Sequence, residues 1–156
     1  MVELYAFIKW LHVLGATVIL GTGLGTAFHF WITMRRENPA AIAAAARSTV
    51  LADFVFTLPA VILQPVTGLA MAKAAGYPLT ATWILGALAL YALAAACWVP
   101  VVFIQVRLRD LAQESARVGR ALPPGFHRLA RIWFALGWPA FAAMAAILWL
   151  MVARPA

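Results

Sequence analysis

Four long apolar stretches, separated by short connections that carry most of the charge, dominate the hydropathy pattern of this 156-residue chain. Each stretch is close to the roughly 20 residues that a helix needs to cross a ~30 Å hydrocarbon layer. The pattern therefore predicts an all-α, four-helix transmembrane bundle that forms a single integral membrane domain over residues 1–156. The expected spans are about 6–33, 50–74, 81–107 and 130–153.

Two of the connections are expected to continue the spans as helices beyond the membrane. Asn38 followed by Pro39 is typical of a helix start, and the alanine-rich stretch 40–46 then leads directly into the second span. The third span is expected to continue as a solvated amphipathic helix to about Gly119, before a break at 121–125. Prolines inside the last three spans remove backbone donors and predict bends.

The composition excludes several classes of protein. The chain is 65% hydrophobic and 11% charged, whereas a soluble domain has about 25% charged and 45–50% apolar residues. A soluble enzyme of this size could not bury so much apolar surface, and a disordered chain would need the opposite balance. The net charge of +7 does not indicate nucleic acid, because basic residues punctuate the apolar runs and form no single stripe. The one cysteine, Cys97, excludes an intramolecular disulfide and a cysteine metal cluster.

The distribution of basic residues predicts the orientation. Most of the lysines and arginines lie in the first and third connections, and the positive-inside rule places these connections in the cytoplasm. Both termini and the short second connection are then outside, in a multi-pass protein of the bacterial inner membrane. The first span has no basic region before it and is too long for a signal peptide, so we expect it to be retained.

Three histidines are candidates for chemistry, because ionisable residues are costly in a bilayer and are often functional. His12 lies near the outer interface, and His29 lies near the cytoplasmic end of the same span, about 25 Å away along the helix axis. His127 lies on the same side as His29. Histidine is a common axial ligand of haem iron, so we expect b-type haem on His12, with Met71, Met151 or solvent as a second ligand, or on the His29–His127 pair. The alternatives are quinone binding, proton transfer or a helix–helix hydrogen bond for His12, and interfacial histidines for the other two.

Other polar residues in the spans need partners. Gln64, which lies between two prolines, requires a hydrogen bond from another helix, a freed carbonyl or a ligand, and Gln105 and Tyr91 raise the same question. Asp53 and Arg107 flank the cytoplasmic ends of the second and third spans and predict an interfacial ion pair.

Two glycines four residues apart, Gly21 and Gly25, lie on one face of the first span. This spacing predicts close packing of that face against another helix. Clearance for a flat cofactor or a lipid tail is the alternative interpretation.

The segment IKWLHVLG at 8–15 resembles the opening helix of the HemJ-type protoporphyrinogen oxidases. Those are four-helix bacterial membrane proteins that bind haem b and oxidise a porphyrinogen. The resemblance covers about one helix and implies that His12 is a haem ligand. The chain has no clear equivalent of the intramembrane lysine of that pattern, so the resemblance does not extend to porphyrinogen oxidation.

Over nearly its whole length the chain resembles an uncharacterised family of small bacterial integral membrane proteins. The segments that carry this resemblance are LHVLG at 11–15, DFVFTLP at 53–59, LQPVTG at 63–68, CWVP at 97–100 and WFALGWP at 133–139. The family implies the membrane fold and transfers no activity.

These observations predict an inner-membrane protein that binds b-type haem and takes part in membrane redox chemistry or electron transfer, with a quinone or a porphyrin as partner. The first alternative is a cofactor-free subunit that packs through its glycine face in a homo-oligomer or a larger membrane complex. The second is a small transporter with His12, Gln64 and Asp53 along its path. The lack of internal repeats and of a membrane-centred carboxylate counts against transport.

Overall fold

The computed structural model describes residues 2–153, and every regular element in that part of the chain is helical. The elements are α1 (Val2–Met34), α2 (Pro39–Ala52), the π-helical turn η1 (Asp53–Thr57), α3 (Leu58–Ala74), α4 (Thr82–Val118) and α5 (Pro124–Ala153). Because α2, η1 and α3 follow one another without a break, residues 2–153 form four continuous helical rods, each long and apolar enough to cross a membrane. The predicted all-α, four-span fold is therefore confirmed.

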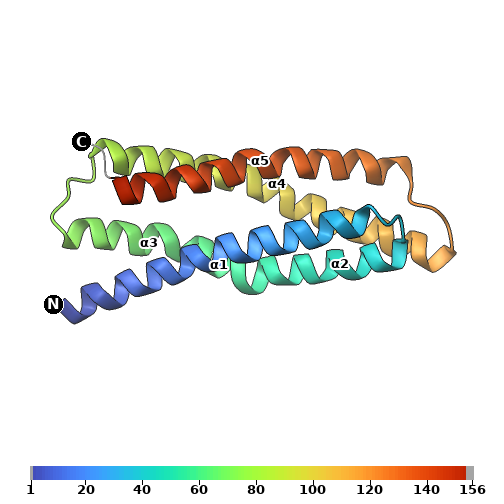
Figure 1. Cartoon of the computed structure of the whole chain (residues 1–156), viewed down its shortest axis with the longest axis horizontal. Coiled ribbons are helices and arrows are strands. Elements are labelled where there is room, and N and C mark those ends of the chain that lie inside the picture. Colours follow the sequence, from blue (N-terminus) through green and yellow to red (C-terminus); the bar gives the residue numbers. More distant parts are fainter. Residues whose placement is uncertain (1, 154–156) are drawn as a thin grey trace.

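The four rods pack lengthwise into an elongated bundle (Figure 1). α1 packs along α2, η1 and α3, while α4 packs along α5 and α2. The start of α1, the turn between α3 and α4 and the end of α5 gather at one end of the bundle. The side of the membrane on which this end lies stays a prediction of the positive-inside rule.

Local sequence explains where the helices begin and end. The Asn38 side chain accepts a hydrogen bond from the amide of Ala41 (3.1 Å), and Pro39 takes the first helical position, so the predicted start of α2 is confirmed. α4 continues to Val118 as expected and ends at Gly119, whose φ of 65° is left-handed. α5 begins at Pro124, ahead of the expected membrane entry, so the fourth rod also has an extension.

The π-helical turn η1 shapes the second rod. Its wide turn is closed by a hydrogen bond from the amide of Leu58 to the carbonyl of Asp53, directly before Pro59. A proline ring collides with the carbonyl four residues earlier in a regular α-helix, and a wider turn relieves that clash. The turn also directs Asp53 and Thr57 into the protein, where each is almost fully buried.

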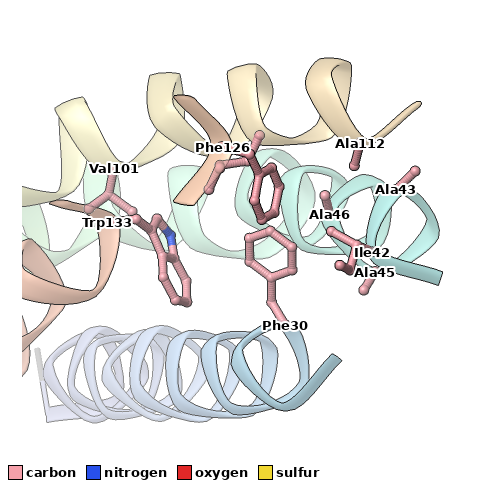
Figure 2. Packing of buried hydrophobic residues seen from close by; sticks show 10 residues of the cluster. Phe30, Ile42, Ala43, Ala45, Ala46, Val101, Ala112, Phe126 and Trp133 are labelled. Carbon is pink, nitrogen blue, oxygen red and sulfur yellow. The ribbon is translucent and has the colours of Figure 1, made fainter. Parts of the chain in front are cut away.

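The apolar core lies toward the opposite end of the bundle from the start of α1 and the end of α5. Figure 2 shows Phe30 of α1 facing Phe126 of α5, beside Trp133. The rings of Phe30 and Trp133 meet edge-on, with their centroids 5.3 Å apart. Alanines of α2 and α4 allow these helices to approach; they are Ala43, Ala45, Ala46 and Ala112. Much of this cluster lies beyond the predicted hydrocarbon layer, where burial from water contributes fully to stability.

We expect Phe30→Ala to lower the free energy of unfolding by about 3–5 kcal/mol, because it empties the centre of this cluster. The phenylalanine is fully buried. The measurement is unfolding in mixed micelles by titration with sodium dodecyl sulfate, followed by circular dichroism.

The matched control is Phe28→Ala, since Phe28 lies on the same helix with 61% of its surface exposed. This control should change the unfolding midpoint little. Equal losses from both substitutions would contradict the placement of the core.

Candidate functional site

Polar side chains inside the rods gather in two places, and both are positioned by the second rod. The first is the contact between α1 and α3, where His12 meets Gln64 and Thr67. The second is one end of a cavity inside the bundle, where Asp53 meets Gln105. At each place, hydrogen bonds between helices hold the polar side chains in position.

At the first place, the hydrogen bonds indicate which ring nitrogen of His12 carries the hydrogen. Its Nδ1 lies 2.8 Å from Oγ1 of Thr67, and the Thr67 hydroxyl also reaches the carbonyl of Leu63 at 2.7 Å. A hydroxyl has one hydrogen to donate, and here it goes to the carbonyl. Nδ1 of His12 is then the donor to Thr67, and the lone pair of a neutral ring lies on Nε2. The alternative expectation of a helix–helix hydrogen bond is confirmed, and ligation by Nε2 stays a prediction.

Two glycines bring α1 and α3 close enough for these contacts. Nε2 of Gln64 donates to the backbone carbonyl of His12 at 2.8 Å, which gives Gln64 the partner on another helix that it needs. A Cβ on Gly15 would come within 2.6 Å of that Nε2 atom. A Cβ on Gly68 would come within 3.1 Å of Cε1 of His12. Gly15 and Gly68 therefore permit the close approach.

The prediction that the face of Gly21 and Gly25 packs against another helix is wrong for contacts within the chain. Gly21 and Gly25 are exposed, and a Cβ on either would meet nothing within 4 Å. Gly23, between them, turns inward, where a Cβ would lie 3.4 Å from the ring of Phe141. The two glycines do share one face of α1, but the helix turns that face away from its neighbours.

Tyr91 completes the polar contacts of α3. Its hydroxyl donates to the backbone carbonyl of Val61 at 2.5 Å. In a regular helix this carbonyl would accept from the amide four residues later, but that residue is Pro65, which has no N–H. A side chain from α4 thus satisfies a carbonyl that proline frees in α3.

The second place is the end of a cavity of about 460 Å³ between α1, α4, α5 and the second rod. The cavity exists because small residues face one another there, among them Gly23 of α1, Ala94 of α4 and Gly137 and Ala140 of α5. Its walls are otherwise largely aromatic. The aromatic lining residues are Phe28, Trp31, Trp98, Trp133, Phe134, Trp138 and Phe141.

A connected polar group lines the same cavity. With the Gln105 amide oriented so that both of its ends are satisfied, its nitrogen donates to Oδ2 of Asp53 (2.7 Å) and its oxygen accepts from Nε1 of Trp133 (3.1 Å). The Trp98 and Thr57 side chains also face the Asp53 carboxylate. Within the described residues, Oγ1 of Thr57 is buried and makes no hydrogen bond of good geometry.

The predicted ion pair between Asp53 and Arg107 is not formed among residues 2–153. Asp53 is 5% exposed and faces Gln105, whereas Arg107 is exposed. Each residue of a helix turns by about 100°, so Arg107 points about 200° away from Gln105 on α4. The two residues lie at a membrane depth that would permit an ion pair, but their side chains lie on helix faces that do not meet.

The remaining expected haem ligands lie apart from the cavity. His29 and His127 are exposed, and the His127 ring lies edge-on to Phe126 at 5.7 Å. Met71 and Met151 are half-buried; Met71 lies one turn beyond Thr67 on the same face of α3. None of these residues lines the cavity, and the described part of the chain contains no cluster of three or more metal-ligating side chains from His, Cys, Asp and Glu.

Sequence reasoning missed Thr57, Trp98 and Trp133 as members of a site. A signal for Trp98 was available, because Trp98 and Gln105 are seven residues apart and therefore share a face of α4. Thr57 could not be placed from spacing alone, since it depends on the π-helical turn.

We expect Tyr91→Phe to destabilise the protein by about 0.6–1.5 kcal/mol, the usual range for one hydrogen bond inside a membrane protein. The loss should shrink when Pro65 is replaced by alanine, because the new amide can then satisfy the carbonyl of Val61. A double-mutant cycle measured by unfolding in mixed micelles tests this coupling. Additive effects of the two substitutions would contradict it.

Comparison with known proteins identifies the family of the chain. The family described as "Predicted integral membrane protein (DUF2269)" matches residues 6–155. No curated protein and no solved structure gave a match. Since the family match covers nearly the whole chain and the fold has four candidate spans, the chain belongs to this family of integral membrane proteins.

Proposed function

We propose that the protein binds a lipid-soluble, ring-bearing small molecule in the cavity between α1, α4 and α5. The observation that carries this proposal is the cavity itself, with its aromatic walls and one buried polar end. Binding sites for small molecules typically occupy about 300–1,000 Å³, are mostly apolar and contain a few convergent polar groups. The cavity has each of these properties.

The position of exposed side chains indicates how such a molecule would enter. Leu24, Phe28, Phe134 and Trp138 line the cavity and are also exposed on the surface of the bundle. They come from α1 and α5, so the cavity opens sideways between these helices, toward the lipid. A ligand dissolved in the bilayer can therefore reach the cavity without crossing water.

Aromatic contacts between α1 and α5 line the cavity near the core. Trp31 stacks on Phe134 with their ring centroids 6.2 Å apart, and Phe30 meets Trp133 edge-on. These contacts hold two helices together across the space that small residues leave open. Flat rings, such as those of the expected quinone or porphyrin partners, are the natural complement of such walls.

We expect decylubiquinone, a neutral ring-bearing probe, to quench the tryptophan fluorescence of the purified protein saturably in lipid nanodiscs. Gly23→Leu should weaken this binding at least about tenfold, because the new side chain projects into the cavity and removes contact area. Empty nanodiscs provide the correction for quinone dissolved in lipid.

Gly21→Leu is the matched control, because it adds the same side chain two residues away on an open face. It should bind the probe like the natural protein. Binding that is lost equally in both variants, or that never saturates, would overturn the proposed site.

A second candidate function is membrane redox chemistry through b-type haem on His12. The supporting observation is the Thr67 hydrogen bond, which fixes the His12 ring and leaves the Nε2 lone pair as the free donor atom. Iron-ligating histidines commonly donate their other N–H to a neighbouring acceptor in this way. Of the two expected methionine ligands, Met71 lies on the same face of α3 as Thr67, which contacts His12. Haem would supply reversible one-electron chemistry.

We expect protein purified from haem-supplemented cells to show a Soret band that His12→Ala abolishes. His29→Ala and His127→Ala should retain the band, because these side chains lie apart from the α1–α3 contact. Thr67→Val should shift the reduced spectrum, since it removes the hydrogen bond that orients the ring. Colourless protein under these conditions, or loss of the band only in the other two histidine variants, would contradict haem on His12.

A further inference from the structure

We infer that the preferred occupant of the cavity is a lipophilic cation, with its charge opposite the Asp53 carboxylate and its apolar body against the tryptophan walls. This inference rests on the proposed function, because it concerns the same cavity. It goes further by assigning the charge of the ligand.

The first step is the unbalanced charge at the polar end of the cavity. Asp53 is almost fully buried, and no lysine, arginine or histidine forms an ion pair with it in the part of the chain that the structure describes. The side chains that face the carboxylate are Gln105, Trp98 and Thr57, all of which are uncharged. Their hydrogen bonds satisfy the oxygens in part but leave the charge unmatched.

The second step is that a buried charge in a membrane protein requires compensation. A carboxylate removed from water is costly unless a proton or a cation neutralises it, and intramembrane acids typically mark ion or substrate sites. A neutral ligand in the cavity would leave Asp53 dependent on a proton. A cationic ligand would supply the missing counter-charge in a place that excludes water, where the attraction is strongest.

The third step is the chemistry of the walls. A tryptophan face is the aromatic surface that attracts cations most strongly, and cages of such faces recognise quaternary ammonium groups. Trp98 and Trp133 both border the polar end with the N–H edge of the indole, Trp98 toward the carboxylate and Trp133 toward Gln105, and both line the cavity beside it. The face of Trp31 already accepts a cation, since the Arg35 guanidinium lies 4.5 Å from its ring. Arg35 itself is exposed and does not line the cavity.

The fourth step concerns Thr57, whose buried hydroxyl has no hydrogen-bond partner of good geometry among residues 2–153. Thr57 lines the cavity on the same turn as Asp53. A hydroxyl oxygen next to a carboxylate is suited to accept from an N–H group or to orient toward a cation. Because the Thr57 hydroxyl faces the carboxylate, its hydrogen is directed there and its oxygen lone pairs remain able to accept. The unmatched charge and this acceptor oxygen thus favour the same class of ligand.

The test compares two probes that differ mainly in charge. Methyltriphenylphosphonium and triphenylphosphine oxide carry the same three rings, with a methyl group on a cationic phosphorus or an oxygen on a neutral one. Binding to the full chain in nanodiscs is followed by tryptophan fluorescence with subtraction of empty nanodiscs. We expect the cation to bind at least about tenfold more tightly than the oxide.

Asp53→Asn should remove this preference by weakening the cation about tenfold while leaving the oxide unchanged. Retained binding of the oxide then shows that the variant is folded. Asp110→Asn, which alters an exposed carboxylate paired with Arg109, is the matched control and should behave like the natural protein. Trp98→Phe provides a second test, since it should weaken the cation severalfold more than the oxide.

Each outcome separates the inference from the proposed function. Equal affinity for the two probes, or a cation affinity unchanged in Asp53→Asn, overturns the cation preference and leaves the cavity a binding site for neutral molecules. Failure of both probes and of decylubiquinone to bind saturably overturns the proposed function as well. A preference for the cation that disappears with Asp53→Asn supports both.

Discussion

Hydrocarbon offers no hydrogen-bond partners, so every polar group inside the four rods has to be satisfied by another part of the chain. This constraint accounts for the contacts between helices. Tyr91 caps the carbonyl that Pro65 frees, Gln64 reaches the backbone of α1, and Gln105 joins Asp53 to Trp133. The charge of Asp53 is left without a counter-charge among the described residues, and this carboxylate lines the cavity next to the hydroxyl of Thr57.

The forces that hold the bundle together differ along its length. Beyond the predicted membrane, Phe126 and the alanines of α2 and α4 bury apolar surface from water, which supplies a strong driving force. Inside the membrane, lipid is as apolar as the side chains, so contact and hydrogen bonding have to suffice. A cavity open to lipid therefore costs less here than in a soluble core, because acyl chains can fill it when no ligand is present.

The sequence was sufficient for the four spans, the start of α2 at Asn38 and the extension of α4, because hydropathy and capping are local properties. It was insufficient wherever the answer depended on which way a helix faces. Depth alone pairs Arg107 with Asp53 although the arginine points away, and spacing alone favours Gly21 for packing although Gly15 is the glycine that meets α3. The π-helical turn changes the direction in which nearby side chains point, and no rule of residue spacing predicts such a turn. The spacing of Trp98 and Gln105 does predict their shared face, which places both residues at one site.

The position of Asp53 also bears on transport, which the sequence disfavoured for lack of a membrane-centred carboxylate. The structure buries this carboxylate inside the bundle and next to a cavity, although it lies near one end of the second predicted span and not at its centre. The arrangement of α1 and α5 gives a different argument against transport. The cavity opens between α1 and α5, while the contacts of Trp31 with Phe134 and of Phe30 with Trp133 join these helices on the side of the buried core. A cation that entered from the lipid would have to separate these rings and the Phe30 core to leave at that end. This conformation therefore supports binding from the bilayer, and passage would require α1 and α5 to part.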